Sequence, residues 1–131
     1  MTKRHKMVCM TLLMMVMMLI SSSSLSVNAL TAAPVTGSIM GYSYRGTFEL
    51  TSTKTTATFS GDAEISNESV PDEPRVELEG GIFNTQGDMI SYPRAYGIKY
   101  CKYSMTFSGA VEGFCEFEID YVYVGRRDIE L

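Results

Sequence analysis

Histidine and tryptophan are almost missing from this sequence, which contains one histidine and no tryptophan. The single histidine, His5, precedes a long apolar segment, so no imidazole is present after residue 29. That part of the chain cannot carry a Ser-His-Asp or Cys-His catalytic mechanism, and it cannot build a histidine-ligated zinc site. Carboxylates are the catalytic groups that remain, and along one strand they are typical of a solvated face. We therefore expect a non-catalytic protein without a metal or a cofactor.

Basic residues are too few for a protein that binds nucleic acid. The formal net charge is −4, and it becomes −7 when the three cations Lys3, Arg4 and Lys6 are set aside with the first 29 residues. Such a domain repels phosphate backbones and anionic lipids. We therefore expect no nucleic-acid partner and no attachment to a membrane through bulk charge.

The amino-terminal segment has the three parts of a secretory signal peptide. Basic residues precede an apolar run of 14 residues from Met7 to Ile20, and a serine-rich segment then leads to Val27-Asn28-Ala29. The run is shorter than the roughly 17 to 25 residues that a transmembrane helix requires. We predict cleavage after Ala29 and a secreted or extracytoplasmic protein, located in the periplasm or at the cell surface if the source is bacterial.

Alternation of apolar and polar residues dominates the rest of the chain, and this period of two is the signal for strands. The clearest case runs from Met40 to Leu50, and a second apolar face is shared by Val76, Leu78, Gly80 and Ile82. We predict an all-β domain over residues 39–124, a small antiparallel β-sandwich or barrel of about 6 to 7 strands. In this interpretation residues 30–38 are an N-terminal extension, and residues 125–131 are a polar, frayed tail.

A tetrapeptide, Thr-Phe-Ser-Gly, occurs twice, at residues 58–61 and at residues 106–109. Each copy lies between alternating segments, so we interpret both as the same kind of turn. Glycine reaches left-handed turn positions at low cost. We therefore predict turns at Gly61 and Gly109.

Two cysteines remain after residue 29, and an even count in an exported chain indicates a disulfide. If residues 107–109 form a three-residue loop, the strands on either side make a hairpin in which Cys101 lies opposite Cys115. This register places Tyr121 and Tyr123 on the apolar face, whereas a two-residue turn would mix glutamates with apolar residues. We therefore predict a Cys101–Cys115 disulfide within this hairpin.

The open end of the predicted hairpin carries apolar residues on both faces. Strands of this kind are usually covered on both sides, so either residues 30–38 fold over this end or the patch is exposed. An exposed patch would suit an interface, because tyrosine and arginine are enriched at binding hot spots. The predicted partner-binding residues are Tyr92, Arg94, Tyr96, Ile98, Tyr100, Val122 and Val124.

These features favour a secreted binding or interaction module whose partner is a protein or another cell-surface component. Tyrosine provides a large contact area at a low entropic cost, and the absence of tryptophan argues against a glycan platform. Two alternatives stay open. The Ser- and Thr-rich stretch at residues 47–60 suggests a membrane-active, toxin-like or bacteriocin-like protein, although Lys54 makes membrane insertion the weaker interpretation. An edge strand that accepts a donor strand would instead suit a self-assembling subunit of a surface structure.

Overall fold

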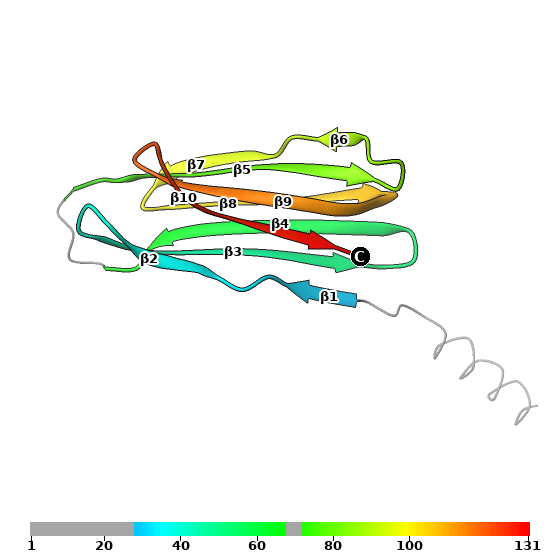
Figure 1. Cartoon of the computed structure of the whole chain (residues 1–131), viewed down its shortest axis with the longest axis horizontal. Coiled ribbons are helices and arrows are strands. Elements are labelled where there is room, and N and C mark those ends of the chain that lie inside the picture. Colours follow the sequence, from blue (N-terminus) through cyan, green and yellow to red (C-terminus); the bar gives the residue numbers. More distant parts are fainter. Residues whose placement is uncertain (1–27, 68–71) are drawn as a thin grey trace, which may run out of the picture.

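The computed structural model describes residues 28–67 and 72–131, and in this part of the chain the regular structure consists of strands. No helix able to span a membrane is found among these described residues. The ten strands form two antiparallel sheets that pack as two layers (Figure 1), which confirms the predicted all-β sandwich. Their bounds are β1 Asn28–Thr31, β2 Val35–Ile39, β3 Tyr42–Ser52, β4 Thr56–Ile65, β5 Arg75–Asn84, β6 Met89–Ser91, β7 Arg94–Ile98, β8 Tyr100–Ser108, β9 Ala110–Ile119 and β10 Val122–Glu130.

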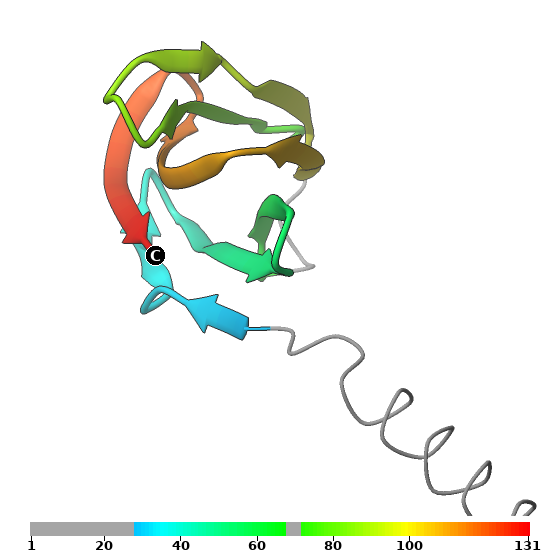
Figure 2. The ribbon, with the colours of Figure 1, turned by 90° about the vertical axis from the view of Figure 1, so that its right-hand side faces the viewer.

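Each of the two sheets contains five of the described strands. In the first, which we call sheet A, the order is β1-β3-β4-β8, and β2 also pairs with β3. In the second, sheet B, the order is β10-β9-β5-β6, and β7 also pairs with β5. Seen end-on, the layers face each other, and β10 runs down one side of the sandwich toward β2 (Figure 2). The chain therefore passes between the layers several times.

The core lies between the sheets and is built by the alternating apolar residues. From sheet A, Phe48 and Phe59 are fully buried, with ring centroids 6.2 Å apart. From sheet B, Val76, Leu78 and Ile82 are also fully buried. The apolar face predicted for this last segment is therefore confirmed. Each such side chain contributes roughly 1.5 to 3 kcal/mol by its removal from water.

The predicted pairing of the segments around residue 109 is wrong. β8 pairs with β4 in sheet A, whereas β9 pairs with β5 and β10 in sheet B. Gly109 has the predicted left-handed backbone, with φ of +74°, but here it lets the chain cross from one sheet to the other. The β4–β8 pair places Thr58 opposite Thr106, and the two hydroxyls share a hydrogen bond of 2.7 Å.

The predicted disulfide is absent because the hairpin that would have aligned the two cysteines does not form. Cys101 and Cys115 are free thiols, and both are buried, as expected for the apolar face. Cys101 lies opposite Ala63 in sheet A, and Cys115 lies opposite Gly80 in sheet B. They therefore belong to different layers of the sandwich.

The strands extend beyond both predicted limits of the domain. Most of the predicted signal peptide lies outside the described residues, but Asn28 and Ala29 begin β1 and pair with Ser52 and Thr51 of β3. Residues 125–130 continue β10 and are not a frayed tail, because Ile129 is buried. Period-two alternation is weak in both segments, so the sequence pattern did not indicate strands there.

Candidate functional site

The outer face of sheet B carries the predicted tyrosine patch in part. Tyr92, Tyr96 and Ile98 have exposed fractions of 57%, 64% and 55%. The side chain of Arg94 lies on the same face and is 54% exposed. The sequence left open whether the patch is exposed or covered by residues 30–38. These four residues are exposed.

Residues 30–38 lie elsewhere. They contribute β1 and β2, which pair with β3 in sheet A. Val35 is buried beside β10, so close that a Cβ at Gly125 would lie 2.7 Å from its side chain. The Arg127 guanidinium donates to the carbonyl oxygens of Ala33 and Pro34 at 2.7 and 3.2 Å. The extension thus closes one side of the sandwich and leaves the outer face of sheet B free.

Three predicted members of the patch are placed differently. Tyr100 is exposed, but it belongs to β8 in sheet A, where it lies opposite Glu64. Val122 is 40% exposed and pairs with Ile119 at the start of β10. Val124 packs against the core, because the register of β10 shifts between residues 123 and 125. The predicted patch is therefore divided: four of its residues lie in or just before β7, and the other three lie in β8 and β10.

Two exposed tyrosines were predicted to be core residues. Tyr121 and Tyr123 have exposed fractions of 73% and 57%. They were assigned to the apolar face by extending the alternation of β9 through residue 124. The structure instead ends β9 at Ile119 and makes a two-residue turn at Asp120 and Tyr121, after which β10 runs back along β9.

Two rows of side chains cross the outer face of sheet B from β7 through β5 and β9 to β10. In the first, the tyrosine–carboxylate row, Tyr96 lies opposite Glu77, Glu77 opposite Glu118, and Glu118 opposite Tyr123. In the second, the arginine–carboxylate row, Arg94 lies opposite Glu79, Glu79 opposite Glu116, and Glu116 opposite Arg126. Neighbouring strands are about 4.8 Å apart, so each row spans roughly 14 Å.

The arginine–carboxylate row is balanced by its own cations. Arg94 lies 3.2 Å from the Glu79 carboxylate, and Arg126 lies 3.3 Å from that of Glu116. Tyr92 also donates a hydrogen bond of 3.1 Å to Glu79. Each carboxylate in this row therefore has a guanidinium partner.

The tyrosine–carboxylate row has two carboxylates and no cation of its own. Glu77 is 3% exposed and is neutralised by arginines from outside the row. Arg94 donates to it at 2.6 Å and Arg75 at 3.3 Å. Glu118, in contrast, forms no ion pair with any of the described residues. Partial burial, together with the charges of Glu77 and Glu79, raises the pKa of the Glu118 carboxyl above its ordinary value.

The end of this face nearest the β9–β10 turn also holds an aromatic cluster around Arg75. The Arg75 guanidinium lies 4.1 Å from the ring centroid of Tyr96 and 5.2 Å from that of Tyr121. Both distances are within the range of cation–π attraction. Tyrosines from β7 and from the turn after β9 thus flank one cation, although their sequence positions are far apart.

Carboxylates outnumber guanidiniums on this face, which gives it a negative character. The outward-facing carboxylates in the ladders are Glu77, Glu79, Glu112, Glu116, Glu118, Asp128 and Glu130, and the guanidiniums are Arg75, Arg94 and Arg126. No group of three or more metal-ligating side chains among the described residues could hold a metal ion. The carboxylates are therefore suited to recognising a cationic group.

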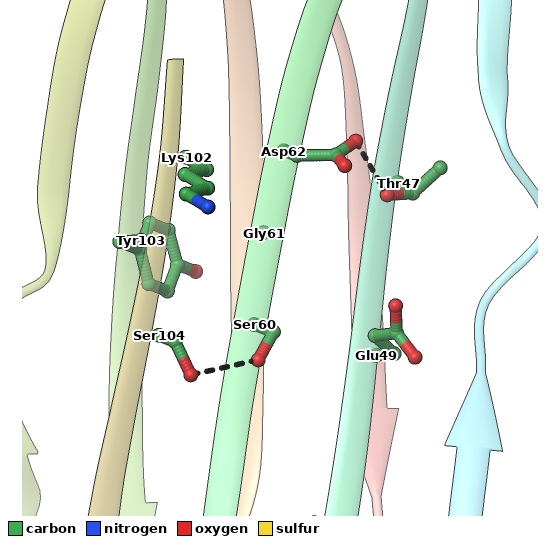
Figure 3. A pocket seen from close by; sticks show the side chains of 8 residues that line it. All are labelled: Thr47, Glu49, Ser60, Gly61, Asp62, Lys102, Tyr103 and Ser104. Atoms are coloured by element: carbon green, nitrogen blue, oxygen red, sulfur yellow. Dashed lines mark hydrogen bonds between the residues drawn. The ribbon is translucent and has the colours of Figure 1, made fainter.

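The outer face of sheet A has a different character. A shallow pocket of about 350 Å³ is lined by Thr47, Glu49, Ser60, Gly61, Asp62, Lys102, Tyr103 and Ser104 (Figure 3). Asp62 accepts a hydrogen bond of 2.7 Å from Thr47, and the hydroxyls of Ser60 and Ser104 are 3.0 Å apart. The Glu49 carboxylate and the Lys102 ammonium, which also line the pocket, form no ion pair with any of the described residues.

Comparison with known proteins gives a limited result. No family model matches the chain, and no curated protein matches it. A solved structure with a similar fold is the KRT10-binding region domain of the pneumococcal serine rich repeat protein PsrP, at 8% identity and a TM-score of 0.49. The alignment covers 82% of this chain and 99% of that domain.

Proposed function

We propose that this chain is an exported, non-catalytic binding module that holds a protein partner on the outer face of sheet B. The observation that carries the proposal is the group of exposed tyrosines Tyr92, Tyr96, Tyr121 and Tyr123 on one face of a rigid sandwich. Contiguous exposed aromatic surface on a small domain marks an interaction site, and tyrosine is enriched where binding energy is concentrated.

The rigidity of the scaffold supports the proposal. β5 lies between β7 and β9 and hydrogen-bonds to both, so Tyr96 of β7 and Tyr123 of β10 are displayed from paired strands. Tyr92 and Tyr121 lie in short connections next to these strands. A surface fixed before binding loses little conformational entropy when the partner docks. Catalysis is not part of the proposal, since no histidine follows residue 29.

Site-specific photo-crosslinking tests the proposal. The photoreactive residue p-benzoylphenylalanine replaces Tyr96 in one exported protein and Lys102, on the outer face of sheet A, in another. We expect an adduct with an extracytoplasmic protein from position 96 and none from position 102. The partner is then purified, and its affinity for wild-type protein and for the Tyr96→Ser and Tyr123→Ser variants is measured.

Each serine variant should weaken binding by roughly 2 kcal/mol or more if these tyrosines are hot-spot residues. The melting temperature should change little, because both side chains are more than half exposed. The same adduct from both positions, or full affinity in both variants, would show that the partner does not bind this face. Loss of several kcal/mol of folding stability would mean that the tyrosines have a structural role.

A further inference from the structure

We propose that the partner presents a basic segment, and that a lysine or arginine of this segment binds Glu118 between Tyr96 and Tyr123. The proposal rests on the proposed function of the same face and names the chemistry of the partner. It is carried by the tyrosine–carboxylate row, in which two carboxylates lie side by side and one of them, Glu118, forms no ion pair with a described residue.

The pairing of β5 with β9 brings two carboxylates of like charge next to each other. Glu77 and Glu118 lie directly opposite each other on β5 and β9, and like charges in such positions destabilise a sheet. Arg75 and Arg94 neutralise Glu77, but neither forms an ion pair with Glu118. Glu118 is also only partly exposed, so water compensates its charge incompletely. A cation from a partner would complete the row, as Arg126 does for Glu116 in the arginine–carboxylate row.

The aromatic residues at both ends of the row fit the same occupant. A lysine or arginine side chain is attracted to the face of an aromatic ring within about 6 Å of its centroid. Arg75 already makes such contacts with Tyr96 and Tyr121, at 4.1 and 5.2 Å. The cluster therefore accepts a guanidinium in this structure, and Tyr123 offers a further exposed ring beside Glu118.

The backbone of Tyr121 gives an independent indication that this end is shaped for binding. Asp120 and Tyr121 form the turn between paired residues Ile119 and Val122, with φ of +46° and +66°. Asparagine and glycine are favoured in such turns, and a bulky side chain is strained there. Asp120 has a structural role, since its carboxylate accepts a hydrogen bond of 2.7 Å from the Arg75 amide. Tyr121 is 73% exposed and adds nothing to the core, so its strain is consistent with a role in recognition.

The probe for this inference is a synthetic octa-arginine peptide, with octa-glutamate as its charge-reversed control. Amide chemical shifts of the wild-type protein are followed by NMR during the titration. We expect shifts centred on residues 75–79, 116–119 and 121–123 with octa-arginine, and none with octa-glutamate. Shifts centred on sheet A, or spread evenly over all acidic residues, would overturn the inference.

Two substitutions that remove the same charge make the test specific. The Glu118→Gln variant should bind octa-arginine about tenfold more weakly than wild type, because it removes the carboxylate that lacks a cation. The matched control is Glu64→Gln, which removes an exposed carboxylate on sheet A and should change affinity less than twofold. Equal losses in the two variants would mean that only net charge matters, and the inference would then be wrong.

A third variant separates recognition from folding. Tyr121→Asn places a residue that tolerates the left-handed conformation in the turn, so we expect a melting temperature at or above that of wild type. Affinity for octa-arginine should nevertheless fall about fivefold, because the ring that flanks Arg75 is removed. Unchanged affinity would exclude Tyr121 from the site.

The two proposals fail in different ways. If position 96 crosslinks a partner whose contact region has no basic residues, the binding face stands and the basic partner is wrong. If octa-arginine binds the tyrosine–carboxylate row but position 96 crosslinks no protein, the cation site stands and the protein-binding function is wrong.

Discussion

Two buried thiols should make the folded domain sensitive to alkaline pH. Cys101 is 5% exposed and Cys115 is fully buried. Burial raises the pKa of Cys101 to about 11 and that of Cys115 to about 12, from an ordinary value of 9.0. The fold therefore holds both thiols in their neutral form, whereas the unfolded chain releases both protons at lower pH.

The sign of the effect follows from linkage. Because the folded pKa values are raised, the unfolded state ionises first, and stability decreases as pH rises from about 9 toward the folded values. Each thiol contributes a loss of about 1.4 kcal/mol per pH unit in this window. Between pH 8 and pH 10 the two thiols together should lower the free energy of unfolding by about 2.5 kcal/mol.

Urea unfolding followed by circular dichroism, at pH 8, 9 and 10 with a reductant present, measures this loss. The control is the double variant Cys101→Ala and Cys115→Ala, which keeps every tyrosine and lysine of the wild type. We expect the free energy of unfolding to fall by about 2.5 kcal/mol less in the variant than in wild type between pH 8 and pH 10. The same decline in both proteins would refute the assignment of buried, neutral thiols. A thiol titration of denatured, unreduced protein gives a second check. If it detects no free thiol, the assignment is also refuted.

Three further substitutions test the packing and the polar contacts. Gly46→Ala places a Cβ 2.4 Å from the buried ring of Phe117, and it should lower the free energy of unfolding by about 1 to 3 kcal/mol in urea titrations. Glu77→Gln leaves Arg75 without its carboxylate and Arg94 with Glu79 alone, and it should cost about 1 to 3 kcal/mol in the same assay, with the loss shrinking in high salt if it is electrostatic. Thr58→Val breaks the exposed hydroxyl pair with Thr106 and should change stability by less than about 1 kcal/mol, so a larger loss would mean that this pair determines which strands meet.

The inward faces of the strands could be predicted from the sequence because burial imposes a simple period. Val76, Leu78 and Ile82 were assigned to one face, and all three are fully buried. The same argument placed Phe48 and Leu50 correctly. Alternation reports which side of a strand faces the core, and it needs no knowledge of the neighbouring strand.

Strand partners could not be predicted from the alternation of apolar and polar residues. This pattern is the same whichever strand lies next to the segment. The segments before and after Gly109 were paired as a hairpin, since consecutive strands are usually adjacent. The repeated tetrapeptide shows the difficulty clearly. Gly109 is in a left-handed conformation as predicted, whereas Gly61 lies within β4 and is not a turn residue. There its missing side chain makes room for the ring of Tyr103, which a Cβ would meet at 3.0 Å.

The sequence predicted only those site residues whose exposure can be inferred from their own strand, without knowledge of the neighbouring strands. Tyr96 was singled out for its apolar character on a polar face, and it is exposed. Glu77 and Glu118 could not be found, because their significance depends on β5 lying between β7 and β9. Tyr121 was missed for another reason: a two-residue turn with a bulky residue has no sequence signature.

The two outer faces differ in how their polar and charged side chains are arranged. On sheet A, polar side chains pair with one another across the strands, as Thr47 does with Asp62 and Ser60 with Ser104. The charged residues Glu49 and Lys102 of the same face form no ion pair with any of the described residues. On sheet B, one row of charges is complete and the adjacent row lacks a cation at Glu118. A cation from a partner would complete this row as Arg126 completes the other at Glu116, and the exposed rings of Tyr96 and Tyr123 lie at the two ends of the row beside it.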